Sequence, residues 1–258
     1  MKSNTFFGGL PDQAIAALVR RGHVAKFAKN QIVYRRGETG ETLMVILSGQ
    51  IKISNVNDEA REVIFNFLGP GDVNGEIAVL DGRERTADAT ALEESEVFIA
   101  YRRDLLPVLM AHPQAMLEVI HTLCDRIRTT SGIIEDSALE MKGRMAKALL
   151  RLSEQHGRAG KDGIRIALAI SQTELGNYMG LSRANVSRLL GWLRDRDIVR
   201  IAGSHIVIID AEGLPVYANM LARACGRSAE LRPVINGKEV RRFVRRTLFD
   251  RRVGDQGA

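Results

Sequence analysis

The run of short β-rich segments between residues 27 and 101 constrains the fold more than any other feature of the sequence. The strand-like segments occupy residues 31–34, 42–47, 51–55, 63–68 and 97–101. Glycines separate them at positions 37, 40, 49, 69, 71, 75 and 82. Many short strands joined by glycine turns are typical of a β-roll or barrel. Residues 12–20 precede this region and predict a short helix with Asp12 as its N-cap.

A helical pattern replaces the strand pattern at about residue 113 and continues to about residue 141. Its apolar or small residues alternate between spacings of four and three, and they are Met116, Ile120, Leu123, Ile127, Thr130, Ile134, Ser137 and Met141. A repeat sustained over three heptads favours a dimerisation helix, with a seam between two copies, over a helix packed on its own domain. The polar residues Thr130 and Ser137 would either set the register of this seam or contact something placed there.

The segment from residue 142 to residue 210 has the pattern of a winged helix-turn-helix. Ser171 and Glu174 form a capping box that opens one short helix, and Ser182 caps a second. The other expected elements are a helix to about residue 153, a polar glycine-rich linker at 154–163, a strand at 164–170, and a hairpin wing with strands at 198–201 and 205–209.

The composition excludes several classes of protein. A chain of 258 residues, 45% of them hydrophobic, suits two modest domains that each bury a core. We expect a cytoplasmic protein, because no apolar run reaches the roughly 20 residues of a membrane span and no secretory signal opens the chain. Cys124 and Cys225 lie far apart, which argues against a disulfide framework or a zinc site. Since we find no nucleophile–base pair or metal cluster, we expect no enzyme.

Residues 75–87 combine groups that suit a phosphorylated sugar. Gly75 precedes a short helical segment that begins with Glu76, and Arg85 and Thr86 follow its end. A helix N-terminus and an arginine can share one phosphate, and a carboxylate can accept a hydrogen bond from a ribose hydroxyl. Similar spacings also occur in ordinary capped surface helices. The residues alone therefore leave both interpretations open.

The same segment resembles the phosphate-binding cassette of the cyclic AMP receptor protein (CRP/FNR) family. The resemblance covers roughly residues 6–210, including the turns around Gly37 and Gly69. It implies that Glu76 holds the ribose 2′-hydroxyl, that Gly75 lets the backbone approach, and that Arg85 and Thr86 bind the cyclic phosphate. It also implies that Thr129 and Thr130 meet the base, with Thr130 reaching from the partner subunit.

The identity of the nucleotide has two candidates. The resemblance implies cyclic AMP as an allosteric ligand, with no other cofactor. Thr86 makes cyclic GMP the second candidate, because a threonine at this position resembles the residue that marks cyclic GMP binding in eukaryotic cyclic-nucleotide-binding modules. Its hydroxyl can accept a hydrogen bond from the guanine 2-amino group. In the alternative interpretation Thr86 binds only the phosphate. Arg83 is a second candidate phosphate ligand, but only Arg85 is followed by the hydroxyl and small residues of the cassette.

The start of the second short helix carries residues suited to reading DNA. Arg183 and Arg188 would point toward base edges in a major groove, where arginine pairs with guanine. Candidates for phosphate contact are Gln172, Thr173 and Ser182, and Asn185 is a candidate for either a base or a phosphate. Ala184 stands where the family often has a glutamate that accepts from cytosine. Because alanine can contact only a thymine methyl, the family's full operator is not expected to transfer.

The C-terminal extension, residues 211–258, lies beyond the resemblance. Residues 226–258 hold nine Lys or Arg and four Asp or Glu, and so supply most of the formal charge of +6. Val240, Phe243, Val244 and Leu248 lie at roughly helical spacing among the arginines. A helix packed on the domain, a second contact with DNA phosphates and a disordered basic tail are all consistent with this pattern.

Together these observations predict an α+β fold in four parts: a cyclic-nucleotide-binding β-roll (1–112), a dimerisation helix (113–141), a winged helix-turn-helix (142–210) and a basic extension (211–258). The expected function is a homodimeric regulator that binds double-stranded DNA in response to a cyclic nucleotide. RNA polymerase is an expected partner, and a membrane is not. The alternatives are a ligand-independent regulator of the same fold and a cyclic-nucleotide-binding regulatory module of an enzyme. Iron–sulfur or haem sensing is not expected without clustered cysteines or a histidine near the cassette.

Overall fold

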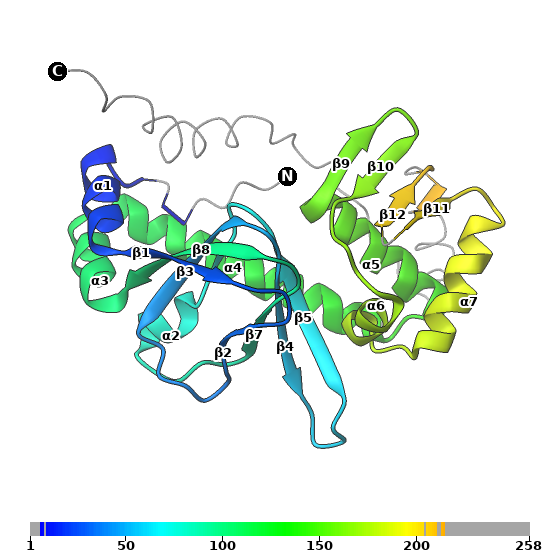
Figure 1. Ribbon diagram of the computed structural model, residues 1–258, viewed down its shortest axis with the longest axis horizontal. Coiled ribbons are helices and arrows are strands. Elements are labelled where there is room, and N and C mark those ends of the chain that lie inside the picture. Colours follow the sequence, from blue (N-terminus) through cyan, green and yellow to red (C-terminus); the bar gives the residue numbers. More distant parts are fainter. Residues whose placement is uncertain (1–5, 8, 204, 211–212, 215–258) are drawn as a thin grey trace.

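The computed structural model describes residues 6–7, 9–203, 205–210 and 213–214. Figure 1 shows a sheet-rich N-terminal part and a smaller C-terminal part, joined by a long helix that runs behind the first. This is the α+β arrangement that the sequence predicts. None of the helices among these residues has an apolar stretch long enough to span a bilayer.

The N-terminal part is a roll of two four-stranded antiparallel sheets. One sheet has the order β1-β8-β3-β6, and its strands are His23–Phe27, Ser95–Tyr101, Thr42–Ser48 and Val73–Asn74. The other has the order β2-β7-β4-β5, and its strands are Ile32–Tyr34, Asp88–Ala91, Ile51–Val56 and Glu62–Leu68. Alternate side chains of both sheets, including Met44, Ile53 and Val97, meet in a shared core. The expected β-roll is therefore confirmed.

Three helices complete the N-terminal part: α1 (Asp12–Arg21), α2 (Glu76–Asp81) and α3 (Arg102–Ala111). The prediction that Asp12 caps α1 is wrong, because Pro11 occupies the cap and Asp12 already lies in the helix. An acidic residue in the first turn still interacts favourably with the helix dipole.

Helix α4 (Pro113–Ser137) is shorter than the sequence predicts, since it ends before residue 141 and α5 (Met141–His156) begins anew. Arg144 stabilises the connection between the two helices. Its guanidinium donates to the carbonyl oxygens of Ser137 at 2.7 Å and Leu139 at 3.3 Å. These bonds satisfy acceptors in the connection that an uninterrupted helix would have used itself.

The exposed face of α4 coincides with the predicted seam at some positions and differs from it at others, and the dimer itself stays a prediction. Met116 and Leu123 pack against the core of their own domain. Ile120, Ile127 and Ile134 are exposed, by 46%, 66% and 65%. The exposed face therefore differs from the predicted one between the isoleucines: Leu117, which is exposed, precedes Ile120 on this face in place of Met116.

The C-terminal part contains the expected helix-turn-helix and wing. Helices α6 (Gln172–Met179) and α7 (Arg183–Arg194) lie against a sheet of order β11-β12-β10-β9, whose strands are Val199–Ala202, His205–Ile208, Gly163–Ile166 and Gly157–Gly160. The prediction of a linker at 154–163 is wrong, because most of that segment forms the end of α5 and strand β9. The predicted strand 164–170 ends at Ile166. Strand β10 pairs with both β9 and β12, and this pairing sets the limits of the strands. The glycine-rich sequence of the segment could not reveal that pairing.

The two parts share an interface built from β5 and α6, which lie side by side in Figure 1. The rings of Phe67 and Tyr178 are in tilted contact, with 5.5 Å between their centroids. Asn177 donates to Glu62 at 3.0 Å, and Gln50 donates to the carbonyl oxygen of Ala167 at 2.9 Å. The C-terminal part therefore packs directly on a strand of the roll.

Candidate functional site

Helix α2 opens at Gly75, which has a φ of +89° and so a backbone conformation that L side chains rarely adopt. A Cβ at this position would meet Arg85 Nη1 and lie 2.8 Å from the carbonyl oxygen of Thr42. Only glycine allows the chain to pass this close to Arg85. The expected approach of the Gly75 backbone to a nucleotide stays a prediction.

Glu76, the first residue of α2, is 1% exposed. Its Oε1 lies 2.5 Å from Arg126 Nη1, and the other terminal nitrogen of Arg126 donates to the carbonyl oxygen of Val73 at 2.6 Å. Oε2 of Glu76 is buried without a hydrogen-bond partner among the described residues. Burial raises the pKa of the Glu76 carboxyl, and the charges of Arg126 and Arg85 oppose that rise.

Arg85 is 5% exposed and is held by its own chain. Its Nη2 donates to the carbonyl oxygen of Thr42 at 2.6 Å and to the Thr42 hydroxyl at 2.7 Å, and its Nη1 donates to the carbonyl oxygen of Gly75 at 3.3 Å. Its Nε is buried without a partner among the described residues. Burial lowers the pKa of Arg85, but a guanidinium remains protonated throughout the physiological range. The structure brings Arg85 beside Gly75, whereas Arg83 is exposed.

The hydroxyl-bearing candidates lie at the margin of this cluster. Thr86 is exposed, and its carbonyl oxygen accepts from Asn55 at 3.1 Å. Thr129 and Thr130 are exposed on α4, where the Thr129 hydroxyl donates to the carbonyl oxygen of Asp125 at 2.8 Å. Thr130 lies one helical turn beyond Arg126.

Sequence reasoning missed Arg126. It comes from α4 and meets a cassette 50 residues earlier in the chain, so no local motif contains it. The one available signal was its spacing of four residues from Thr130, which puts both residues on one face of a helix.

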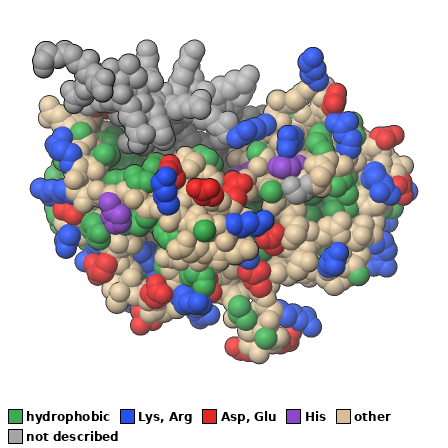
Figure 2. All heavy atoms as spheres, viewed as in Figure 1, with side chains coloured by type: hydrophobic (Ala, Val, Ile, Leu, Met, Phe, Trp, Pro, Cys, Tyr) green, Lys and Arg blue, Asp and Glu red, His purple; other side chains and the backbone are tan. Residues whose placement is uncertain are grey.

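Helix α7 has one buried and one charged face. Val186, Leu189, Leu190 and Leu193 are buried, whereas Arg183 and Arg188 are exposed. Ser182 caps the helix by accepting from the backbone amide of Asn185, as predicted. Arg188 donates to the Asn185 side chain at 2.6 Å. Figure 2 shows Lys and Arg side chains along the outer edge of this part, where α7 lies in Figure 1.

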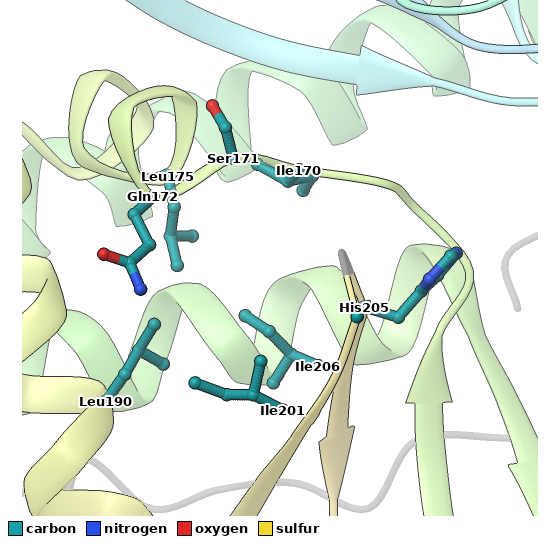
Figure 3. Close-up of a pocket in the computed structure, with 9 residues that line it drawn as sticks. Ile170, Ser171, Gln172, Leu175, Leu190, Ile201, His205 and Ile206 are labelled. Atoms are coloured by element: carbon teal, nitrogen blue, oxygen red, sulfur yellow. The ribbon is translucent and has the colours of Figure 1, made fainter.

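The candidates at the start of α6 differ in exposure. The capping box of Ser171 and Glu174 is confirmed. Thr173 is exposed, but Gln172 is half-buried and lines a small cavity of about 160 Å³ between the helices and the wing. Figure 3 shows its amide projecting from α6 toward Leu190, opposite Ile201 of the wing.

Known proteins resemble both parts. Residues 24–112 match the family of the cyclic nucleotide-binding domain, and residues 143–216 match the Crp-like helix-turn-helix domain. The chain is 30% identical to a CRP-like cAMP-activated global transcriptional regulator of Mycobacterium tuberculosis, over 81% of this chain and 93% of the relative. It is also 30% identical to the cAMP-activated global transcriptional regulator CRP of Salmonella typhimurium, over 72% of this chain and 89% of the relative.

Solved structures agree on the fold. FixK2 from Bradyrhizobium japonicum superposes with a TM-score of 0.69 at 22% identity, over 76% of this chain and 96% of that chain. The named sequence relatives are transcriptional regulators and not enzymes. The chain therefore belongs to the CRP family of cyclic-nucleotide-binding transcription regulators.

Proposed function

We propose that this regulator binds cyclic AMP in the cassette and, as a homodimer, binds operator DNA more tightly when the nucleotide is bound. The observation that carries the proposal is the burial of Glu76 and Arg85 beside Gly75, with Arg126 of α4 paired to Glu76. Buried ionic groups in such a cluster are typical of a ligand site. The cAMP-activated relatives in Mycobacterium tuberculosis and Salmonella typhimurium support cyclic AMP as the ligand.

The donors and acceptors of the cluster suit a cyclic nucleotide. Arg85 would bind the cyclic phosphate together with the Thr86 hydroxyl, and Glu76 would accept from the ribose 2′-hydroxyl. The buried and unpartnered Glu76 Oε2 and Arg85 Nε support this fit, because such groups are rare unless a ligand or water satisfies them. Thr129 and Thr130 are proposed to meet the base, with Thr130 reaching from the partner subunit.

The ion pair between Glu76 and Arg126 supports a route from the nucleotide to DNA. A nucleotide that binds Glu76 changes the surroundings of Arg126 and so biases the position of α4. At the far end of α4, Asp136 is paired with Arg151 of α5, which belongs to the core of the DNA-binding part. Differential contacts of this kind shift the population toward one arrangement of the two parts.

The exposed apolar face of α4 supports the homodimer. Ile120, Ile127 and Ile134 recur every seven residues and remain exposed in the single chain. With Leu117, Cys124 and Ser131 between them, they form a continuous a/d line, which a second copy would cover. In a parallel pair the two recognition helices would face successive major grooves, with Arg183 and Arg188 reaching guanines. RNA polymerase remains a proposed partner on the promoter.

Cys124 offers a direct test of that dimer. It lies on the proposed seam, so the two copies would place their thiols side by side. In a Cys225→Ser background, mild oxidation or a short bismaleimide should link two chains through Cys124, and Cys124→Ser should prevent the link. A chain that stays uncrosslinked and sediments as a monomer contradicts the proposed seam.

Calorimetry tests the ligand. Titration with cyclic AMP should give saturable binding with one site per chain, and 5′-AMP, which lacks the cyclic phosphate, should bind much more weakly. If neither cyclic AMP nor cyclic GMP binds at millimolar concentration, the proposed ligand dependence is wrong, and a ligand-independent regulator of this fold takes its place.

A further inference from the structure

Tyr34 of β2 lies against the guanidinium of Arg85. The Arg85 Cζ atom is 4.3 Å from the centroid of the Tyr34 ring, within the range of a cation–π contact. The Tyr34 hydroxyl donates to Asn74 Oδ1, and Asn74 directly precedes Gly75. Tyr34 therefore bridges the opposite sheet of the roll to the arginine and to the backbone at the start of the cassette.

The other contacts of Arg85 leave its planar face to this ring. Nη1 donates to the carbonyl oxygen of Gly75 and Nη2 to that of Thr42, and these bonds lie along the edge of the guanidinium. A guanidinium can pivot about such bonds unless its face is also packed. The Tyr34 ring supplies that packing and an attraction to the positive charge.

The surroundings keep the Tyr34 hydroxyl protonated, so that it can donate a hydrogen bond. Burial raises the pKa of the phenol well above its ordinary value, and the nearby Glu76 carboxylate adds to the rise, against the opposing charge of Arg85. Asn74 is only 7% exposed, so the hydrogen bond to it is shielded from water. Ring and hydroxyl together fix Tyr34, and through it Arg85.

We propose that Tyr34 is a positioning residue of the phosphate site: its ring holds the Arg85 guanidinium where it meets the anionic oxygens of a cyclic nucleotide. This inference rests on the proposed function, in which Arg85 binds the cyclic phosphate. Tyr34 itself does not contact the nucleotide, and the ring matters more than the hydroxyl.

The test compares Tyr34→Leu, Tyr34→Phe and wild type by calorimetry with cyclic AMP, on the full chain. Tyr34→Leu removes the ring and should weaken binding about tenfold or more, as expected from loss of a desolvated cation–π contact and of preorganisation. Tyr34→Phe keeps the ring and should stay within about threefold of wild type. Tyr101→Leu is the matched control, because the Cζ atom of Arg103 lies 4.9 Å from the centroid of the Tyr101 ring in a cation–π contact outside the cassette. The affinity of this variant for cyclic AMP should equal that of wild type.

The outcomes separate positioning from structure and from the proposed function. Equal affinity of Tyr34→Leu and wild type, or equal losses for Tyr34→Leu and Tyr34→Phe, overturns the role of the ring. If Tyr34→Leu fails to fold by circular dichroism, a fluorinated phenylalanine at position 34 replaces it, since fluorination weakens the quadrupole and keeps the shape. Fluorination should then lower affinity relative to Tyr34→Phe, and no change overturns the inference. A wild type that binds no cyclic nucleotide instead removes the proposed function on which the inference rests.

Discussion

The nucleotide cassette and the recognition helix both depend on arginines, but they hold them in opposite ways. Arg85 is 5% exposed and donates three hydrogen bonds to its own chain, whereas Arg183 and Arg188 are exposed on α7. A nucleotide in the cassette would meet side chains that already bind the protein's own backbone, so its binding would be coupled to the fold around it. DNA would meet side chains that are already exposed, although Arg188 would have to leave its partner Asn185.

In the proposed function, this difference would let the cassette sense the nucleotide and let α7 bind DNA. Breaking a buried ion pair leaves an uncompensated charge and is costly, while exposed charges contribute little until a partner desolvates them. The energetic link between ligand and protein is therefore concentrated in the cassette. The two regions should accordingly respond very differently to mutation.

The largest effect is expected at Arg85. Arg85→Ala removes the charge proposed to neutralise the cyclic phosphate, and should weaken cyclic AMP binding by a few kcal/mol, because charge-assisted bonds in buried sites are strong. Arg83→Ala is the matched control, since Arg83 lies two residues away and is exposed. Calorimetry should show near loss of binding for the first variant and wild-type affinity for the second. The reverse ranking would make Arg83 the phosphate ligand.

Smaller losses are expected on α7. Arg183→Ala or Arg188→Ala should cost about 1–3 kcal/mol on the best operator and relax preference at one base pair each. Arg194→Ala, at the other end of the helix, serves as the control. Binding to a library of operator variants measures both affinity and preference. An equal loss on every sequence would mean that these arginines bind phosphates and read no base.

The stability of the protein should depend on pH through His156, which lies where α5 of the C-terminal part meets β5 of the roll. Burial lowers the pKa of His156 to about 4, although the backbone of Phe67 in β5 partly opposes the shift. Between about pH 6.5 and 4, His156 is therefore protonated in the unfolded chain and neutral in the folded chain. The free energy of unfolding falls as the pH drops through this window. Between pH 6.5 and 5 thermal or urea unfolding should show a loss of roughly 1–2 kcal/mol from this group. His156→Leu should lack this component; an identical pH profile in the variant would exclude it.

The smallest effect concerns the choice between nucleotides. If the Thr86 hydroxyl accepts from the guanine 2-amino group, Thr86→Ala should weaken cyclic GMP more than cyclic AMP, by about 1 kcal/mol, the value of one hydrogen bond. Thr90→Ala, in the neighbouring strand β7, provides a control for loss of a threonine hydroxyl. Equal losses for both nucleotides would restrict Thr86 to the phosphate, and absence of cyclic GMP binding to wild type would leave cyclic AMP alone.

Local chemistry predicted much of both regions. Alternating apolar residues and glycine turns specified five strands of the roll, and Ser171 and Ser182 marked the starts of α6 and α7. The missed features depend on partners distant in sequence. Arg126, Tyr34 and the β9–β10 hairpin act through tertiary contacts, and no spacing within one segment reveals them. The sequence predicted Met116 and Leu123 on the exposed face of α4, but they pack on the core, because periodicity cannot tell which apolar face the protein's own core will cover. The three interpretations of the basic extension concern residues 215–258, which lie outside the described residues.

The central claim is that the nucleotide in the buried cassette controls the exposed DNA-binding face. A mobility-shift titration on a pool of genomic fragments, with no nucleotide, with cyclic AMP and with cyclic GMP, tests it most directly, and Arg85→Ala provides the internal control. We predict that a subset of fragments is bound at least tenfold more tightly with cyclic AMP, and that Arg85→Ala loses this enhancement while keeping the basal affinity. Identical binding curves with and without either nucleotide, in a protein that binds DNA specifically, would contradict the account.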